Sequence, residues 1–244
     1  VVVAKVAQGT AETVDMAVQA AHKAQKAWAA LPLAERKAYA EKCMQINMES
    51  MGDLVEIAVR DAGYEKRTAE LDFGIAIGSW QYYLSVIDKF LEPEVINDEA
   101  FDAYTYKVPK GVCGAIVPWN MPICLCMSKL PLAILTGNTI VVKPPSDAPA
   151  ALSLLLQRFA KALPDGVINI VNGGGGTIGT ALCEHPLITK IGFTGGTEGG
   201  IDVAERCAKH LKTCTLELGG NDAAIVLPDA DMNEVVPAML NGTL

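Results

Sequence analysis

The amino-acid sequence predicts an α/β fold, in which a parallel sheet is flanked by helices and preceded by an N-terminal helical segment. From residue 110 onward, short apolar segments alternate with segments of helical periodicity, and this alternation is typical of a parallel sheet. Before that point, residues 11–62 keep apolar side chains at helical spacing. With 244 residues, half of them hydrophobic, the chain has enough material for a sizeable core.

Three helices are expected before residue 91. The first covers residues 11–31 with Thr10 as its N-cap, and the second begins at Pro32 and ends near Gly63. The third covers residues 68–91. Residues 91–109 then change character, because acidic loop residues lead into the alternating stretch AYTYKV. This segment is interpreted as an arm or an edge strand.

Strands and helices alternate in the rest of the chain. Strands are expected at residues 111–118, 138–145, 166–173, 188–196 and 214–227. Helices are expected at residues 123–137, 148–163, 176–186 and 198–211. Ligands bind at the carboxyl ends of the strands in such sheets. The segments VPWN, KPPSD, NGGGG, FTGGTEGG and ELGGN all fall at those ends, which predicts one shared site.

Composition limits the classes of partner. The net charge of −8 argues against nucleic acid or an anionic membrane as the main partner. No uninterrupted apolar run reaches the ~18 residues of a membrane span, and no signal peptide is visible. The seven cysteines lack metal-like spacing, so we expect no metal site but reduced, buried thiols in a cytoplasmic protein.

Three polar residues at strand ends invite a chemical interpretation. Glu217 lies in the apolar, glycine-rich run TLELGGN, so either this run is exposed or the carboxylate has a function. Asn120, held between two prolines in PWNMP, is either a rigid amide donor for an oxyanion or the cap of the following helix. Lys143 suits a nucleotide hydroxyl or phosphate, or it is a solvated end of its strand.

Glycines and cysteines allow weaker interpretations. The cluster GFTGGTEGG stands between a strand and a helix, where it forms either a phosphate-binding turn or simply a tight turn. Cys214 is three residues from Glu217, and strand alternation places the two on opposite faces, so we do not expect Cys214 to be a nucleophile. Packing is the expected role of Cys124 and Cys126.

Five ordered motifs resemble the NAD(P)-dependent aldehyde dehydrogenase superfamily. They are GAIVPWNMP, NTIVVKPPSDAP, LPDGVINIVNGGG, KIGFTGGTEGG and TLELGGNDAAIVLPDADMN. The resemblance covers the whole chain, weakly before residue 105 and strongly over residues 110–234. It implies a Rossmann-like NAD(P)-binding domain over residues 1–244, an oligomerisation arm at 91–109, and a homodimer or homotetramer. It also implies NAD or NADP as cofactor and oxidation of an aldehyde to a carboxylic acid through a cysteine thioester.

The resemblance assigns roles to individual residues. Glu217 matches the general base that activates water, Asn120 matches the oxyanion-hole asparagine, and Lys129 matches a lysine of the catalytic neighbourhood. The positions that match cofactor-binding residues are Ile116, Pro118, Trp119, Lys143, Ser146, Gly175, Gly179, Thr194, Gly195, Gly196, Thr197, Gly200 and Leu218.

The sequence departs from the family pattern at several positions. Ser146 stands where an acidic residue usually holds the ribose hydroxyls, so NADP should be tolerated better than usual, although Asp147 could partly restore discrimination. Gly196 and Gly199 replace a serine and an apolar residue, which should loosen cofactor binding. Glycine at both positions removes side-chain contacts.

None of the seven cysteines matches the family's nucleophile. We therefore expect this chain to be the coenzyme-binding part of a longer enzyme, cut before the catalytic cysteine and inactive alone. Two alternatives remain, an acylating coenzyme-A-dependent aldehyde dehydrogenase and a non-catalytic nucleotide-binding relative. Glu217 argues against the first, because thiolysis needs no base that activates water.

Overall fold

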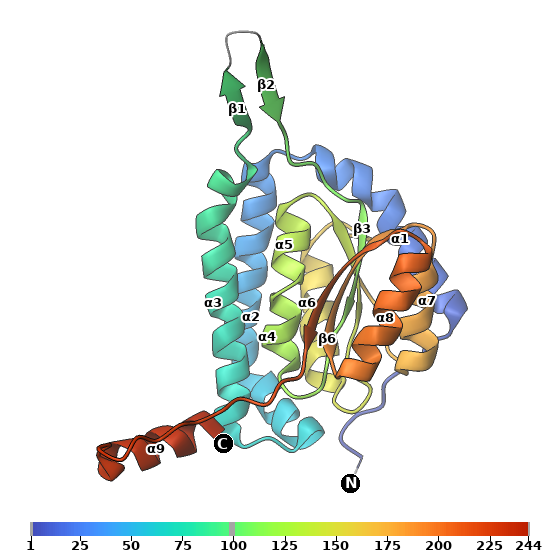
Figure 1. The fold of residues 1–244 in the computed structure, drawn as a ribbon. Helices are drawn as coiled ribbons and strands as arrows, with labels where there is room; N and C mark the ends of the chain where they lie inside the picture. The colour runs from blue at the N-terminus through green and yellow to red at the C-terminus, as the bar shows by residue number, and fades with distance from the viewer. Residues whose placement is uncertain (1, 98–100, 244) are drawn as a thin grey trace.

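The computed structural model describes residues 2–97 and 101–243. Its centre is a parallel five-stranded sheet in the order β5-β4-β3-β6-β7 (Figure 1). The strands are β3 (Val112–Ile116), β4 (Thr139–Lys143), β5 (Ile168–Ile170), β6 (Ile188–Gly195) and β7 (Thr213–Leu218). The chain runs outward from β3 to β5 and then returns to the other side of β3. The predicted α/β class and its parallel Rossmann-like sheet are thus confirmed.

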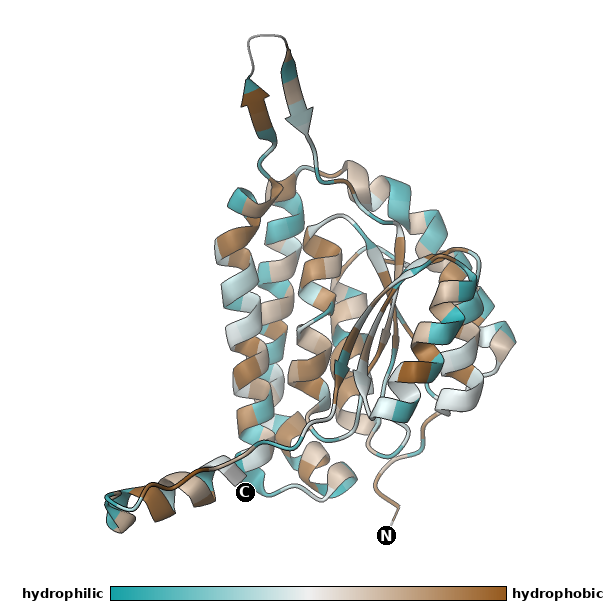
Figure 2. Ribbon diagram, in the orientation of Figure 1, coloured by the Kyte–Doolittle hydropathy of each residue, from teal (hydrophilic) through white to brown (hydrophobic). Residues whose placement is uncertain are grey.

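Helices cover both faces of the sheet and separate two hydrophobic cores. On one face lie α1 (Ala11–Ala30), α7 (Thr180–Glu184) and α8 (Thr197–Lys209). On the other lie α4 (Pro122–Met127), α5 (Leu130–Leu135) and α6 (Ala150–Ala162), with α2 (Leu33–Ala62) and α3 (Lys66–Leu91) as an outer layer. Hydrophobic and hydrophilic residues alternate along these helices in Figure 2. Helices α2 and α3 therefore complete the second core, whereas most buried residues of α1 pack in the first core.

The helix ends follow local sequence signals. Thr10 caps α1 as predicted, because its hydroxyl accepts the Thr13 N–H and the Thr13 hydroxyl bonds back to the Thr10 carbonyl. Gly63 ends α2 in the left-handed conformation, with φ of 74°. Pro32 is the residue before α2 and not its first helical residue, which moves the predicted start by one position.

The single helix predicted over residues 123–137 is wrong, because the structure has two short helices there. α4 ends at Met127 and α5 begins at Leu130, and Lys129 between them has a φ of −120°. Pro131 explains the break, since its nitrogen carries no hydrogen for the bond that a continuous helix would make to the Met127 carbonyl. The break turns the Lys129 side chain toward the sheet, where it contacts Gly192.

The glycine-rich segment after β5 also differs from a plain helix. Residues Gly175–Gly179 form a π-helical turn, η1, which continues directly into α7. Such turns are uncommon and are frequently found at functional sites.

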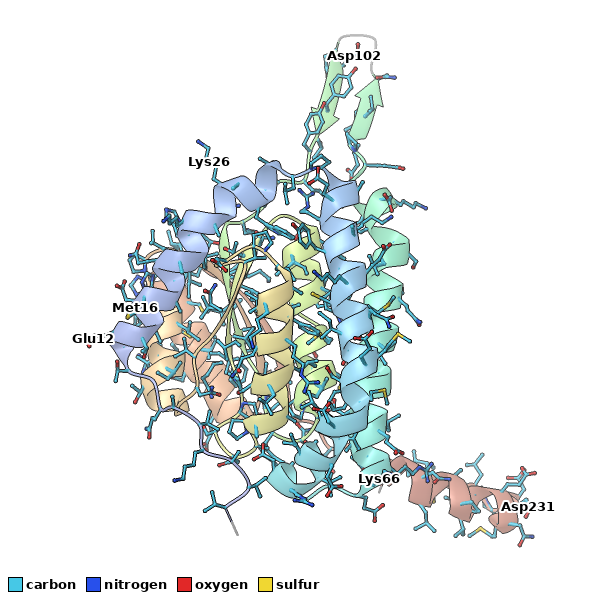
Figure 3. All side chains as sticks on the ribbon, turned by 180° about the vertical axis from the view of Figure 1, so that it is seen from behind. Glu12, Met16, Lys26, Lys66, Asp102 and Asp231 are labelled. Atoms are coloured by element: carbon cyan, nitrogen blue, oxygen red, sulfur yellow. The ribbon has the colours of Figure 1, made fainter. Side chains whose placement is uncertain are left out.

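The C-terminal segment departs from the sequence-based expectation. The strand predicted over residues 214–227 ends at Leu218, and residues 219–229 are exposed without regular hydrogen-bonded structure. An additional helix, α9 (Met232–Thr243), lies beyond the predicted elements and contains Pro237. Figure 1 shows this segment leaving the sheet, and Figure 3 shows Asp231 far from the body of the molecule.

The predicted arm at residues 91–109 contains a two-stranded antiparallel hairpin. Its strands are β1 (Glu94–Asn97) and β2 (Asp102–Thr105), and residues 98–100 of the predicted arm lie outside the described residues. The hairpin projects from the body of the molecule, with Asp102 at its far end in Figure 3. At its base, Lys107 pairs with Glu94 at 3.2 Å.

Two further expectations concerned the state of the cysteines and membrane-spanning segments. All seven cysteines are free, and only Cys214 among them is not fully buried, as expected for reduced thiols. In the described part of the chain, no helix combines the length and the apolar character needed to cross a membrane.

Candidate active site

A cavity of about 1000 Å³ opens between the sheet and the α4–α5 pair. The three predicted catalytic residues, Asn120, Lys129 and Glu217, all line it. Of the predicted cofactor residues, it is lined by Pro118, Trp119, Thr194, Gly195, Gly196 and Leu218. These residues come from the carboxyl ends of β3, β6 and β7 and from the segment before α4. Of the five segments expected to share one site, VPWN, FTGGTEGG and ELGGN meet at this cavity, whereas KPPSD and NGGGG do not line it.

Glu217 stands on the edge strand of the sheet. Strands β6 and β7 pair in parallel with Thr194 opposite Glu217. Thr215 and Glu217 line the cavity, whereas Cys214 packs against the core on the other face. The side chain of Glu217 is exposed in this chain, so the run TLELGGN does not bury an unpaired carboxylate.

Lys129 reaches the same strands from the helix break. Its aliphatic chain lies over Gly192, where an added Cβ would come within 3.2 Å of the Lys129 Cδ. The Nζ donates to the Thr194 hydroxyl at 2.6 Å and to the Leu125 carbonyl at 3.1 Å. Burial lowers the pKa of Lys129, and the charge of nearby Glu217 partly opposes that change. The arrangement brings an ammonium, a hydroxyl and a carboxylate to one wall of the cavity.

Asn120 faces the cavity without a hydrogen-bond partner among the described residues. The alternative role of Asn120 as a helix cap is wrong. Met121 occupies the N-cap position of α4, and the first free N–H groups of the helix bond instead to Asp72 of α3. The Asn120 amide is therefore available to a ligand.

Sequence reasoning did not single out Asp72. This carboxylate is 1% exposed, and it accepts the Ile123 N–H at 3.1 Å and the Cys124 N–H at 2.7 Å. Burial raises the pKa of Asp72, and the two backbone hydrogen bonds oppose that rise. One available signal was the position of an acidic residue on the inward face of a helix, beside Phe73 and one turn before Ala76.

Lys143 belongs to a second group of predicted cofactor residues, away from the cavity. It is 4% exposed, so the alternative of a solvated strand end is wrong. Its Nζ donates to the Gly173 carbonyl at 3.1 Å, and the Ser146 hydroxyl donates to the same oxygen at 3.2 Å. Burial lowers the pKa of Lys143, and Asp147 partly opposes this effect. The two side chains thus tie the end of β4 to the glycine loop after β5.

The remaining predicted cofactor residues surround that loop and the start of α8, and they do not line the cavity. A Cβ added to Gly175 would meet open space, whereas one added to Gly179 would lie 3.8 Å from the Ile116 Cδ1. Thr197 is the first residue of α8. A Cβ on Gly200 would come within 2.4 Å of the Leu218 Cδ2, so glycine there lets α8 approach β7 closely.

The cysteine side chains of the described chain do not form an activated nucleophile. Burial raises the pKa of Cys126 to about 12 and that of Cys113 to about 11. The pKa of Cys124 is raised by burial and by the charge of Asp72. A thiol becomes nucleophilic when its pKa falls, and these thiols are shifted in the opposite direction. Within residues 2–97 and 101–243, no cluster of three or more His, Cys, Asp or Glu side chains could hold a metal ion.

The structure is a doubly wound α/β fold with a cavity at the point where the strand order reverses, between β3 and β6, which is where such folds bind ligands. The model of the aldehyde dehydrogenase family matches residues 1–244. The chain therefore belongs to the aldehyde dehydrogenase family.

Individual relatives agree with this assignment. DhaS of Bacillus subtilis (strain 168), whose name places it among the aldehyde dehydrogenases, is 36% identical over 241 residues, or 97% of this chain and 49% of its own length. An NAD⁺ complex of an aldehyde dehydrogenase from Bacillus cereus is 33% identical with a TM-score of 0.92, over 97% of this chain and 49% of that one. The chain spans about half the length of these relatives.

A third relative extends the range of cofactors. Glyceraldehyde-3-phosphate dehydrogenase GapN from Methanocaldococcus jannaschii, solved in complex with NADP, is 30% identical. Its TM-score is 0.93, over 99% of this chain and 54% of that one. Members that resemble this chain equally well in fold therefore bind either NAD⁺ or NADP.

Proposed function

We propose that this chain is the NAD(P)-binding part of an aldehyde dehydrogenase that oxidises an aldehyde to a carboxylic acid through a cysteine thioester. The observation that carries the proposal is the meeting of Asn120, Lys129 and Glu217 in one cavity at the carboxyl edge of the sheet. The nucleophilic cysteine belongs to a part of the enzyme beyond these residues, which agrees with a chain that spans half the length of its relatives. The chain alone is therefore inactive in aldehyde oxidation.

The residues present fit a dinucleotide. Gly196 caps α8 without a side chain, and open space surrounds both Gly196 and Gly175, so a phosphate can approach the backbone closely. The first N–H groups of α8 and its positive dipole end suit a pyrophosphate. Lys143 and Ser146 hold the β4–α6 turn against the glycine loop, where the ribose would lie. When bound, the coenzyme supplies the nicotinamide that accepts a hydride.

The polar side chains of the cavity have separate tasks in this chemistry. The Asn120 amide donates a hydrogen bond to the aldehyde oxygen as it gains negative charge, and one such donor is worth about 2.7–4 kcal/mol. Glu217 accepts a proton from the water that attacks the thioester, which releases the carboxylic acid and the free thiol. Lys129 holds the Thr194 hydroxyl in place and brings a positive charge near Glu217.

Cofactor preference follows from Ser146. The hydroxyl is exposed and uncharged, so it neither repels a 2′-phosphate nor binds both ribose hydroxyls as a carboxylate does. We therefore propose that the enzyme accepts NADP as well as NAD. The neighbouring Asp147 partly restores discrimination against NADP. The substrate is a small-molecule aldehyde.

Assembly and location are part of the same proposal. The hairpin strands present large apolar side chains to solvent, with Val95 51%, Ile96 56% and Tyr104 57% exposed. An exposed two-stranded edge with such side chains supports pairing with another subunit, so we propose a homodimer or homotetramer. Seven free cysteines support a reducing, cytoplasmic location.

The decisive experiment compares the 244-residue chain with the longer protein that contains it. Both are assayed for NADH and NADPH formation with a panel of aldehydes, with and without coenzyme A. Turnover by the longer protein alone, without coenzyme A, supports the proposal. Turnover that requires coenzyme A indicates an acylating enzyme. Nucleotide binding without any turnover indicates a non-catalytic relative, and turnover by the 244-residue chain contradicts the proposed division of the site.

A further inference from the structure

Two side chains, one from α3 and one from the α2–α3 connection, form hydrogen bonds to the backbone of the turn that carries Asn120. From α3, the buried carboxylate of Asp72 accepts the N–H groups of Ile123 and Cys124. From the α2–α3 connection, the Tyr64 hydroxyl donates to the Trp119 carbonyl. One contact therefore precedes Asn120 in the chain and the other follows it.

The position of the Asn120 amide depends on this backbone. Its side chain has no hydrogen-bond partner among the described residues, and Trp119 beside it is 54% exposed. Neither side chain is therefore held in place by contacts of its own. The orientation of the amide follows from where the main chain at residues 119–124 is anchored, and the anchors are Tyr64 and Asp72.

The contact made by Asp72 is not an ordinary helix cap. Caps usually come from the residue directly before the helix, and here that residue is Met121, whose thioether is only a weak acceptor and makes no capping hydrogen bond. The acceptor comes from a helix 51 residues earlier in the sequence. Phe73 on the same helix and Ile123 of α4 share one buried core. The start of α4 is thus registered against α3 and not only against the sheet.

A buried carboxylate is a costly way to satisfy two backbone donors. An ionised side chain loses hydration on burial, and it is retained only where its hydrogen bonds compensate. Both carboxylate oxygens of Asp72 are used, one for each N–H, so the bonds constrain the turn in two directions. Such a bidentate contact defines an orientation in addition to satisfying donors.

We propose that Asp72, assisted by Tyr64, is a positioning residue that sets the Asn120 amide at the oxyanion site. This inference rests on the proposed function, because it assigns Asn120 its role in oxyanion stabilisation. It adds two residues outside the cavity that act through the turn carrying Asn120. A displacement of about 1 Å in such a donor is enough to cost about 100-fold in rate.

The test uses the longer protein that contains this chain and measures the rate constant of NAD(P)H formation in the first turnover. Asp72→Asn keeps the side-chain shape but replaces one acceptor oxygen by an amide nitrogen. We expect a loss of about 10- to 100-fold in that rate constant. The dissociation constant of NAD⁺ should stay within about twofold, since Asp72 does not touch the proposed coenzyme site.

A double-mutant cycle separates positioning from general destabilisation. In the Asn120→Ala background the amide is absent, so Asp72→Asn should cost less than about twofold there. An equal loss in both backgrounds would show that Asp72 acts by some route other than Asn120, and would overturn the proposal. Tyr64→Phe, which removes only the hydroxyl, should lower the rate constant in the same direction with little effect on folding.

Asp61 offers a matched control. Its carboxylate accepts the Ala150 N–H at 2.6 Å at the start of α6, and burial raises the pKa of Asp61 as it does for Asp72. Asp61→Asn should lower the melting temperature but leave the first-turnover rate constant at saturating coenzyme within about twofold. If Asp61→Asn and Asp72→Asn lower that rate constant equally, the positioning role is excluded.

Hydrogen exchange of the longer protein keeps this inference separate from the proposed function. Asp72→Asn should speed amide exchange in a peptide covering residues 121–127 and leave one covering residues 150–156 unchanged. If the wild-type longer protein oxidises no aldehyde but this exchange pattern is observed, only the proposed function is contradicted. Unchanged exchange at residues 121–127 would overturn the positioning role whatever the activity.

Discussion

Thr194 and Glu217 lie side by side as register partners on the parallel strands β6 and β7. The Thr194 hydroxyl also accepts a hydrogen bond from Lys129 at 2.6 Å. Thr194 therefore neighbours the proposed general base on one side and contacts Lys129 on the other. Lys129 lies between α4 and α5, in the only break between described helices that lies beside the cavity. Strands β6 and β7 and the α4–α5 break each contribute a residue to this wall of the cavity. Substitutions of these residues should therefore affect different steps of the proposed reaction.

Glu217→Gln should separate formation of the thioester from its hydrolysis. The amide keeps the size of the side chain but cannot accept a proton from water, so a burst of NAD(P)H should be followed by slow turnover. Rapid-mixing kinetics of the longer protein measure both phases. Glu205→Gln, at an exposed position on α8, should leave both phases unchanged. Unaltered steady-state turnover in Glu217→Gln would remove this residue from the mechanism.

Ser146→Glu should shift cofactor preference toward NAD. A carboxylate at this exposed position repels a 2′-phosphate and accepts hydrogen bonds from the ribose hydroxyls. The ratio of kcat/KM values for NAD and NADP is the measurement, and a change of about tenfold corresponds to 1.4 kcal/mol. Ser146→Gln has the same length without the charge, so it should shift the ratio much less. Equal ratios for the Glu and Gln variants would contradict the electrostatic explanation.

Gly200→Ala should loosen the contact between α8 and β7. The added Cβ would meet the Leu218 Cδ2 at 2.4 Å, and overpacking of this kind costs about 1–3 kcal/mol. Urea unfolding gives the change in stability. Gly52→Ala is the matched control, because open space surrounds Gly52 within α2 and alanine there should stabilise by about 0.5–1 kcal/mol. In a Leu218→Ala background the cost of Gly200→Ala should largely disappear.

Lys129 should make stability depend on pH in the alkaline range. Because burial lowers its pKa below the ordinary 10.5, the unfolded chain binds more protons than the folded chain between the two values. The wild type should therefore gain stability relative to Lys129→Met as pH rises through that window, and the difference should be constant below it. Urea midpoints at several pH values measure the effect.

Local signals predicted much of the fold. Thr10 and Gly63 mark helix ends because capping depends on residues within a few positions of the end. The alternation of apolar strands and helices after residue 110 predicted the parallel sheet, since each face of such a sheet must be covered. The break between α4 and α5 was not predicted, because the apolar run around Pro131 favoured a single helix.

Some features of the site had no local signal. The exposure of Glu217 follows from the position of β7 at the sheet edge, which depends on strand order. The burial of Lys143 follows from the approach of Gly173, thirty positions away, whose carbonyl the ammonium bonds. Neither the edge position of β7 nor the approach of Gly173 can be predicted from the residues adjacent in sequence.

The sequence by itself determined the elements, the order of the motifs and their place at the carboxyl ends of strands, because periodicity, caps and turns act over a few residues. Tertiary structure alone decided which of those ends share the cavity, and it selected Asp72 as an anchor of the turn that carries Asn120. The physical reason is that a hydrogen bond across 51 residues forms only after two helices have packed. Its partner depends on their packing geometry and not on local preference.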